Sequence, residues 1–481
     1  MENFWDYSVW GFFNLLSVLM GSLLAANTLK RKIPWLGASL IPTSVLGGGV
    51  LLVLVGIYRL ITGEDMFETA FFGYQGTANL ELLTYHTLAL GFIASSFKTS
   101  DGKITKQRSV EIFNTGVTTV ATYLLQAVVG FTITLVAAKV IEGFFPAAGV
   151  LLPFGFGQGT GQALNYGNIY EVDFGFDGGK SFGLTIAALG FLSASIGGVI
   201  HLNLLKKRGL ILHGAQAEGE IRSEKIQAAN EIPMQESIDK MTVQIALIVV
   251  AYMIAYLMMY GLGLLLPGMR SVIYGFNFLL GVLSGTIVKA VLGWLHKTHL
   301  MNREYTNDFL MTRASNFFFD LMVVSGIAAI RLSALEQYWG IMLILGVVGM
   351  AITYGYNYYV AKTLFPAYAQ EQFLTMYGML TGTASTGVIL LREIDGEFKT
   401  PASDNMVYQN FPAIVFGFPL MFLATLAPVK PMLTYVVLVL FFLVMNVILF
   451  RSKLFGKKPP ERKYCKTPGF GPEFFAGKLP L

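Results

Sequence analysis

The chain has 481 residues, of which 54% are hydrophobic and only 13% are charged, whereas a soluble globular domain carries roughly 25% charged residues. Because so few charges cannot cover a water-facing surface of this size, the composition indicates a multi-spanning membrane protein. The net charge is +5, but the basic residues lie between apolar segments, so we expect no nucleic-acid partner. The single cysteine, Cys465, excludes an intramolecular disulfide and disfavours a structural metal site.

Apolar segments of about 20 residues, the length that spans a hydrocarbon core, recur along the chain. We expect eleven membrane-spanning helices. In chain order they cover about residues 8–27, 41–62, 83–97, 112–141, 182–205, 242–266, 272–295, 310–330, 338–363, 408–427 and 432–450. Acidic rather than basic residues precede the first segment, which favours a retained helix over a signal peptide.

The charge of the connections predicts an orientation. Clusters of lysine and arginine follow the first, third and fifth spans and the last span, whereas acidic residues follow the second and fourth. Because positively charged connections stay on the cytoplasmic side, we expect the N-terminus outside and the C-terminus in the cytoplasm. The predicted location is the inner or plasma membrane.

Two glycine-rich, polar stretches interrupt the apolar pattern, at residues 153–168 and 378–387. Such backbone is tolerated at membrane depth only where protein or a water-filled cavity satisfies its amides. The charge alternation holds only if each stretch enters and leaves on the same side. We therefore expect one re-entrant loop at about 147–170 from the outside and another at about 370–393 from the inside.

The expected fold is an all-α polytopic membrane protein with an inverted repeat. Each half has five spans and one re-entrant loop, and because five is odd the halves have opposite orientations. The predicted divisions are a first repeat at 1–205, a cytoplasmic linker at 206–240, a second repeat at 241–427, an additional transmembrane helix at 428–451 and a basic cytoplasmic tail at 452–481.

Interrupted segments at matching places in two halves indicate a transporter binding site. Glycines expose backbone amides and carbonyls to a ligand, and small hydroxyl side chains add further ligands. The alternative is close helix packing by small residues. The predicted substrate-binding residues are Gly157, Gln158, Gly159, Thr160, Gly161, Thr381, Gly382, Thr383, Ser385 and Thr386.

Charged residues near these segments give further hypotheses. Asp320 is an acid inside a predicted span, which by default indicates function. With Asn316 it is expected to bind a coupling cation, or to carry a proton; alternatively it pairs with Lys289. Arg392, at the exit of the second loop, could bind a substrate carboxylate bidentately, or it simply holds that loop end at the water interface.

Three motifs carry a family resemblance. Gly157-Gln-Gly-Thr-Gly-Gln-Ala163 is similar to the Gly-Gly-His-Gly-Thr-Gly-Ala-Ala motif of the bacterial sodium/glutamate symporter family. Gly378-Met-Leu-Thr-Gly-Thr-Ala-Ser-Thr386 resembles that family's Gly-Phe-Gly-x-Gly-Ala-Thr-Pro-Thr motif. Ile41-Pro-Thr-Ser-Val-Leu-Gly-Gly-Gly49 resembles its Ile-Pro-x-Pro-Val-x-Gly-Gly segment. The likeness covers about residues 5–427.

This resemblance implies Na⁺-coupled symport of glutamate by a homodimer, with both loops contributing to a central site. The chain departs from the family at Gln158, which replaces a histidine, in its fewer glycines in the second motif, and in the added last helix and tail. We therefore expect a secondary active transporter that moves glutamate or a related acidic amino acid or organic anion by alternating access.

Other functions stay open at this stage. Within transport, the alternative is a proton-coupled organic-anion carrier that uses Asp320; from another class, it is an ion channel. The chain has no HExxH or GxSxG motif, no paired intramembrane acids and no cysteine–histidine set. We therefore expect no enzyme activity, no catalytic residues, no metal site and no cofactor, with Na⁺ as the coupling ion.

Overall fold

The computed structural model describes residues 3–37, 41–97, 106–208, 231–234, 238–336, 338–395 and 400–454. These residues form helices and no β-strand; one isolated bridge joins Glu231 to Glu304. The all-α prediction is therefore confirmed. Most of the predicted linker and nearly all of the predicted basic tail lie outside the described residues.

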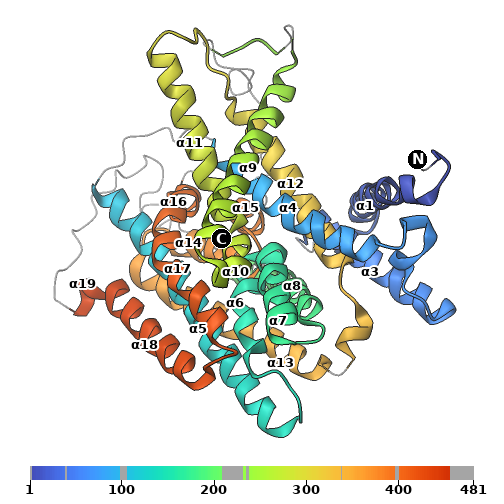
Figure 1. The fold of residues 1–481 in the computed structure, drawn as a ribbon. Coiled ribbons are helices and arrows are strands. Elements are labelled where there is room, and N and C mark those ends of the chain that lie inside the picture. The colour runs from blue at the N-terminus through green and yellow to red at the C-terminus, as the bar shows by residue number, and fades with distance from the viewer. Residues whose placement is uncertain are drawn as a thin grey trace, which may run out of the picture.

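The described part of the first half contains the long helices α1, α3, α4, α5 and α8 and one broken helix (Figure 1). The elements are α1 Tyr7–Lys32, α2 Pro34–Gly37, α3 Thr43–Thr62, η1 Met66–Glu68, η2 Ala70–Phe72, α4 Gly76–Ser96, α5 Lys106–Val140, η3 Pro146–Leu151, α6 Leu152–Phe156, α7 Gly159–Phe174 and α8 Gly179–Lys207.

The second half repeats this order of long and broken helices. Its elements are α9 Lys240–Leu265, η5 Pro267–Met269, α10 Arg270–Gly275, α11 Asn277–Lys297, α12 Asp308–Ala328, η6 Leu332–Leu335, α13 Trp339–Leu364, α14 Ala369–Thr381, α15 Ala384–Arg392, α16 Ala402–Tyr408, α17 Asn410–Leu426, α18 Pro431–Leu449 and α19 Arg451–Leu454.

Eight helices of the described chain are long and apolar enough to cross a membrane: α1, α3, α5, α8, α9, α11, α13 and α18. The bent pair of α16 and α17 would make a ninth span. The chain is thus a multi-pass membrane protein. The two other expected spans coincide with α4 and α12, whose hydropathy is lower because both helices carry charged residues.

Helices α4 and α12 pack along one another, which explains how they tolerate this polarity. Their contact includes a 3.0 Å hydrogen bond between the hydroxyls of Thr84 and Ser325 and a 2.8 Å bond between those of Ser95 and Ser315. A helix that faces other helices rather than lipid needs less apolar surface, and small polar residues bring such helices together.

The helices pair in a pattern that occurs twice. Helix α1 packs on α3 as α9 packs on α11, and α3 packs on α12 as α11 packs on α4. Likewise α8 packs on α13, and α17 packs on α5. In each case the partners in one half of the chain correspond, in chain order, to the partners in the other half. In Figure 1, α1 with α3 and α9 with α11 extend outward, and the broken helices lie in the rest of the molecule.

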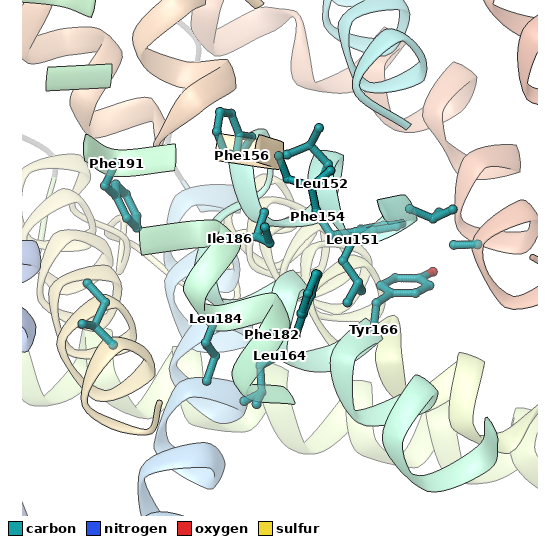
Figure 2. Close-up of a cluster of buried hydrophobic side chains, with 14 of the residues drawn as sticks. Leu151, Leu152, Phe154, Phe156, Leu164, Tyr166, Phe182, Leu184, Ile186 and Phe191 are labelled. Atoms are coloured by element: carbon teal, nitrogen blue, oxygen red, sulfur yellow. The ribbon is translucent and has the colours of Figure 1, made fainter. Parts of the chain in front are cut away.

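The most tightly packed apolar region surrounds the first broken helix. Figure 2 shows side chains of η3 and α6 lying against α7 and α8, with the ring of Phe154 close to that of Tyr166. These two rings stack with centroids 3.9 Å apart. Phe154, Phe156 and Phe182 are fully buried. This packing fixes the arms of the broken helix, so that the break itself is held in place.

Candidate functional site

The first glycine-rich stretch forms a helical hairpin. One arm comprises η3 and α6, the other is α7, and the backbone turns at Gly157-Gln158-Gly159. The stacking of Phe154 on Tyr166 joins the two arms across this turn. Gly159 has a φ of +80°, a left-handed conformation that costs other residues roughly 1–2 kcal/mol. A glycine is therefore favoured where the chain reverses.

Contacts with α5 give the depth of this turn. Thr134 of α5 donates a 2.7 Å hydrogen bond to the carbonyl of Pro146, where the hairpin begins. The hydroxyl of Tyr123 donates a 3.1 Å bond to the carbonyl of Gly157, at its tip. The first arm therefore runs antiparallel to α5 and ends beside Tyr123, which is the midpoint of the Lys106–Val140 helix.

The second glycine-rich stretch also forms a helical hairpin, with α14 and α15 as its arms and Gly382-Thr383 as its turn. The arms are in close contact, because a Cβ added to Gly378 would lie only 2.8 Å from the Cα of Gly387. This approach leaves no space for a side chain at that position. Small residues here thus serve packing between the arms.

The second hairpin approaches the middle of α5 from that helix's other end. Tyr368, just before α14, donates a 2.7 Å bond to Glu111 near the start of α5. At the tip, Nε2 of Gln126 donates a 2.9 Å bond to the carbonyl of Leu380. Helix α14 therefore runs parallel to α5, and its tip lies within one helical turn of Tyr123.

The two tips meet. A Cβ added to Gly159 would lie 3.5 Å from Cγ2 of Thr383 and 3.8 Å from the carbonyl oxygen of Gly382. Gly190 of α8 lies against both hairpins, since a Cβ there would lie 2.5 Å from the oxygen of Thr381 and 3.2 Å from the Cα of Phe156. Segments far apart in the sequence thus form one junction in the interior.

Not all of the predicted substrate-binding residues reach this junction. Gly157, Gly159, Gly382 and Thr383 form the two turns, and the hydroxyls of Thr383 and Thr386 lie 3.4 Å apart. Gln158 is partly buried in the first turn. The side chain of Ser385 lies outside the described part of the chain.

Two other predicted residues contact neighbouring helices, and a third bonds within its own helix. The hydroxyl of Thr160 lies 3.5 Å from the carbonyl of Met322 in α12, and Gly161 lies against Leu88 of α4. The hydroxyl of Thr381 donates a 2.6 Å bond to the carbonyl of Tyr377 in its own helix. For these positions the structure supports packing, the alternative interpretation of the glycine-rich pattern.

The predicted coupling residues lie on α12, where both Asp320 and Asn316 are exposed. The carboxylate of Asp320 hydrogen-bonds to Ser44 of α3. The charged neighbour of Lys289 is Asp308 rather than Asp320. Arg392 is exposed at the far end of α15, and nine helical residues place it roughly 12 Å from the turn.

Sequence reasoning missed a residue close to the first tip. Gln162 lies in the first turn of α7, is 2% exposed, and neither atom of its amide has a hydrogen-bond partner among the described residues. An unpaired buried polar group costs about 1–3 kcal/mol, so such groups in a native protein call for a ligand or water. The residue stood within the quoted first motif, but its lack of partners becomes visible only in three dimensions.

The helix ends at the junction carry opposite partial charges. Helices α7 and α15 begin there, and no side chain caps either N-terminus. Helix α14 ends there at Thr381. Free amides at helix N-termini favour anions, and free carbonyls at C-termini favour cations. The junction therefore offers places for both an anion and a cation.

Ion pairs fix the base of the first hairpin. Lys180, at the start of α8, lies 2.8 Å from Glu81 of α4 and 3.5 Å from Glu171 of α7. Glu171 also lies 3.1 Å from Arg331, which follows α12. These pairs join the base of the first hairpin to α4 and to the end of α12.

A separate cavity of about 400 Å³ lies between α9 and α10, lined by Tyr256, Tyr260, Arg270 and Tyr274. None of the predicted site residues lines it.

The chain matches no protein-family model and no curated protein. The candidate site therefore stands on the geometry of the two hairpins alone.

Proposed function

We propose that this protein is a secondary active transporter that moves an anionic substrate by alternating access. The observation that carries the proposal is the meeting of two broken helices, which start at opposite ends of α5 and end beside its midpoint. If α5 crosses the bilayer, the hairpins enter from opposite faces and their tips meet at mid-membrane. Broken helices that meet at the midplane form substrate sites in many transporters.

The repeated pattern of helix pairs supports an inverted repeat within this proposal. The two halves pair their helices in the same order, and their hairpins approach α5 from opposite directions. Alternating access in inverted-repeat proteins is a movement of one bundle of helices against the other around a fixed site. We place the N-terminus outside and the C-terminus in the cytoplasm, as the connection charges favour.

We propose glutamate or a related acidic amino acid or organic anion as the substrate, with Na⁺ as the coupling ion. The uncapped N-termini of α7 and α15 favour a carboxylate between the tips, and the unpaired amide of Gln162 could bond either a carboxylate or an ammonium group. The choice of glutamate and of a homodimer depends on the family resemblance described above.

Proton coupling through Asp320 has less support, because its carboxylate is exposed and bonds to Ser44 rather than to a residue of either tip. Na⁺ coupling needs no titratable group at the junction, whereas proton coupling does. An ion channel would require a continuous pore through the junction, where the space between Gly159 and Thr383 holds one methyl group.

Uptake by proteoliposomes tests the proposal. Purified protein should accumulate radiolabelled glutamate against its gradient when Na⁺ is imposed outside, with saturation and competition by aspartate or other dicarboxylates. Uptake driven only by a proton gradient would transfer the proposal to the proton-coupled carrier. Conductance without saturation, or failure of every acidic substrate under both gradients, would contradict it.

A further inference from the structure

Two buried amide oxygens beside the tip of the second hairpin have no partner. They are Oε1 of Gln126 in α5 and Oδ1 of Asn357 in α13, and neither bonds to any described residue. Gln126 is fully buried and Asn357 is 1% exposed. Unsatisfied acceptors at this depth are costly because no bulk water reaches them.

The orientation of both amides is set by their nitrogen atoms. Nε2 of Gln126 donates 2.9 Å bonds to Oγ1 of Thr353 and to the carbonyl of Leu380. Nδ2 of Asn357 donates a 2.9 Å bond to the carbonyl of Thr353. Rotating either amide by half a turn would place an oxygen against an acceptor, so the oxygens remain the unpaired atoms.

Both amides bond to Thr353, Gln126 to its hydroxyl and Asn357 to its carbonyl, so these two residues lie at the same part of α13. Thr353 and Asn357 are one turn apart on α13, so their side chains share a face of that helix, and Gln126 approaches this face from α5. Helix α14 ends close by, at Thr381, one residue beyond the carbonyl that Gln126 binds. The last carbonyls of a helix have no intrahelical partners and carry a partial negative charge.

This surplus of oxygen acceptors and negative partial charge matches a cation. We propose a Na⁺ site formed by Oε1 of Gln126, Oδ1 of Asn357 and the carbonyl end of α14. Hard cations bind oxygen ligands, and in transporters with broken helices the exposed carbonyl ends coordinate Na⁺. This site rests on the proposed function and adds a location for the coupling ion, which lies beside the substrate junction rather than at Asp320.

A buried polar stripe leads from this site toward the start of α5. Its members on α5 are Glu111, Thr115, Thr119, Thr122 and Gln126, all buried. Gln372 donates a 3.2 Å bond to Thr115, and Thr119 donates a 2.8 Å bond to Gln409. This stripe joins the proposed site to the start of α5, at the proposed cytoplasmic face.

Sodium binding can be measured without transport. Unfolding of the purified full-length protein in detergent is followed while NaCl replaces choline chloride at constant ionic strength. A ligand that binds the folded state raises its stability with concentration, so the titration gives an apparent Kd. We expect Asn357→Ala to raise this Kd by roughly 10-fold or more, and Asn357→Asp, which keeps an oxygen there, to retain Na⁺ binding.

Asn446→Ala is a matched control. Asn446 also donates to the carbonyl one turn earlier, at 2.8 Å, but its oxygen accepts a 2.9 Å bond from Tyr356. Asn446→Ala should lower the stability of the protein and leave the Na⁺ titration unchanged. If Na⁺ stabilises the native chain no more than choline does, the oxygens bind only water and the site is refuted. If the Na⁺ titration of Asn357→Ala equals that of the native chain, the proposed location of the site is refuted. Na⁺ binding without uptake of any acidic substrate would retain the site and reject the transport function.

Discussion

Gly159 and Thr383 face each other where the two hairpins meet, with space for one methyl group between them. Gly159 is the first residue of α7 and Thr383 directly precedes α15, so the backbone amides of two helix N-termini lie near this pair. The pair therefore joins the geometry of the fold to the proposed chemistry. Changes at this contact should affect function more than folding.

Gly159→Ala and Gly159→Val should have graded effects on uptake. The Cβ of alanine would lie 3.5 Å from Cγ2 of Thr383, an ordinary contact, but alanine is strained at a φ of +80°, by roughly 1–2 kcal/mol. The extra methyls of valine would fill the space between the tips. Gly175→Ala is the control, because Gly175 has a φ of +71° and nothing near it. It should lose similar stability and keep uptake, and equal loss of uptake in Gly175→Ala would argue against a site at the tips.

Tyr123→Phe removes the hydrogen bond from the middle of α5 to the carbonyl of Gly157. We expect a loss of about 0.5–1.5 kcal/mol in stability and a change in the KM for substrate, because the first tip loses its anchor. Tyr435→Phe is the control: the Tyr435 hydroxyl accepts a 3.1 Å bond from Thr132 on an exposed part of α5. Substrate titrations of uptake should separate the two variants, and identical KM values would show that this anchor does not position the tip.

Gln162→Leu should leave the protein as stable or more stable while abolishing substrate binding. Replacing a buried amide whose two polar atoms lack partners removes an unsatisfied group and keeps the volume similar. Such an exchange of stability for function is typical of binding sites. Thermal unfolding with and without glutamate measures both effects.

Asn165→Leu is the comparison, since Asn165 bonds the carbonyl of Gly275 at 3.2 Å and its loss should destabilise the protein. A Gln162→Leu variant that unfolds earlier than the native chain, yet still responds to glutamate, would assign Gln162 a structural role.

Glu171→Gln should loosen the base of the first hairpin. It weakens the pairs with both Lys180 and Arg331, whose side chains are only partly exposed. We expect the stability of the protein to fall by about 1–3 kcal/mol, which lies between the values for surface and buried ion pairs. Arg59→Met, which breaks a pair with the 73% exposed Glu336, should change the unfolding temperature little. A larger effect of Arg59→Met would show that these pairs do not anchor the hairpin.

The glycine-rich segments were predictable because their cause is local. Gly159 needs a left-handed backbone, and the polar run around it cannot continue a lipid-facing helix, so the sequence itself marks the break. Broken helices at 146–174 and 369–392 cover the two glycine-rich segments, and the re-entrant course expected for 147–170 and 370–393 stays a prediction.

Other features depend on partners distant in sequence. The predicted span at 83–97 omits the first two turns of α4, where Glu81 reduces the hydropathy; its partner Lys180 lies on α8. The unpaired oxygens of Gln126 and Asn357 likewise cannot be read from the sequence. Each residue is an ordinary amide until the packing of α5, α13 and α14 shows which atoms have partners.

Labelling from the two sides of the membrane tests the central claim, that the hairpins enter from opposite faces. With Cys465, the single native cysteine, replaced by serine, Asp173→Cys and Glu393→Cys place thiols at the exposed ends of the first and second hairpins. In intact right-side-out cells, a membrane-impermeant maleimide should label position 173 and should label position 393 only after permeabilisation. Labelling of both positions in intact cells, or of neither, would contradict the inverted arrangement and the transport mechanism that depends on it.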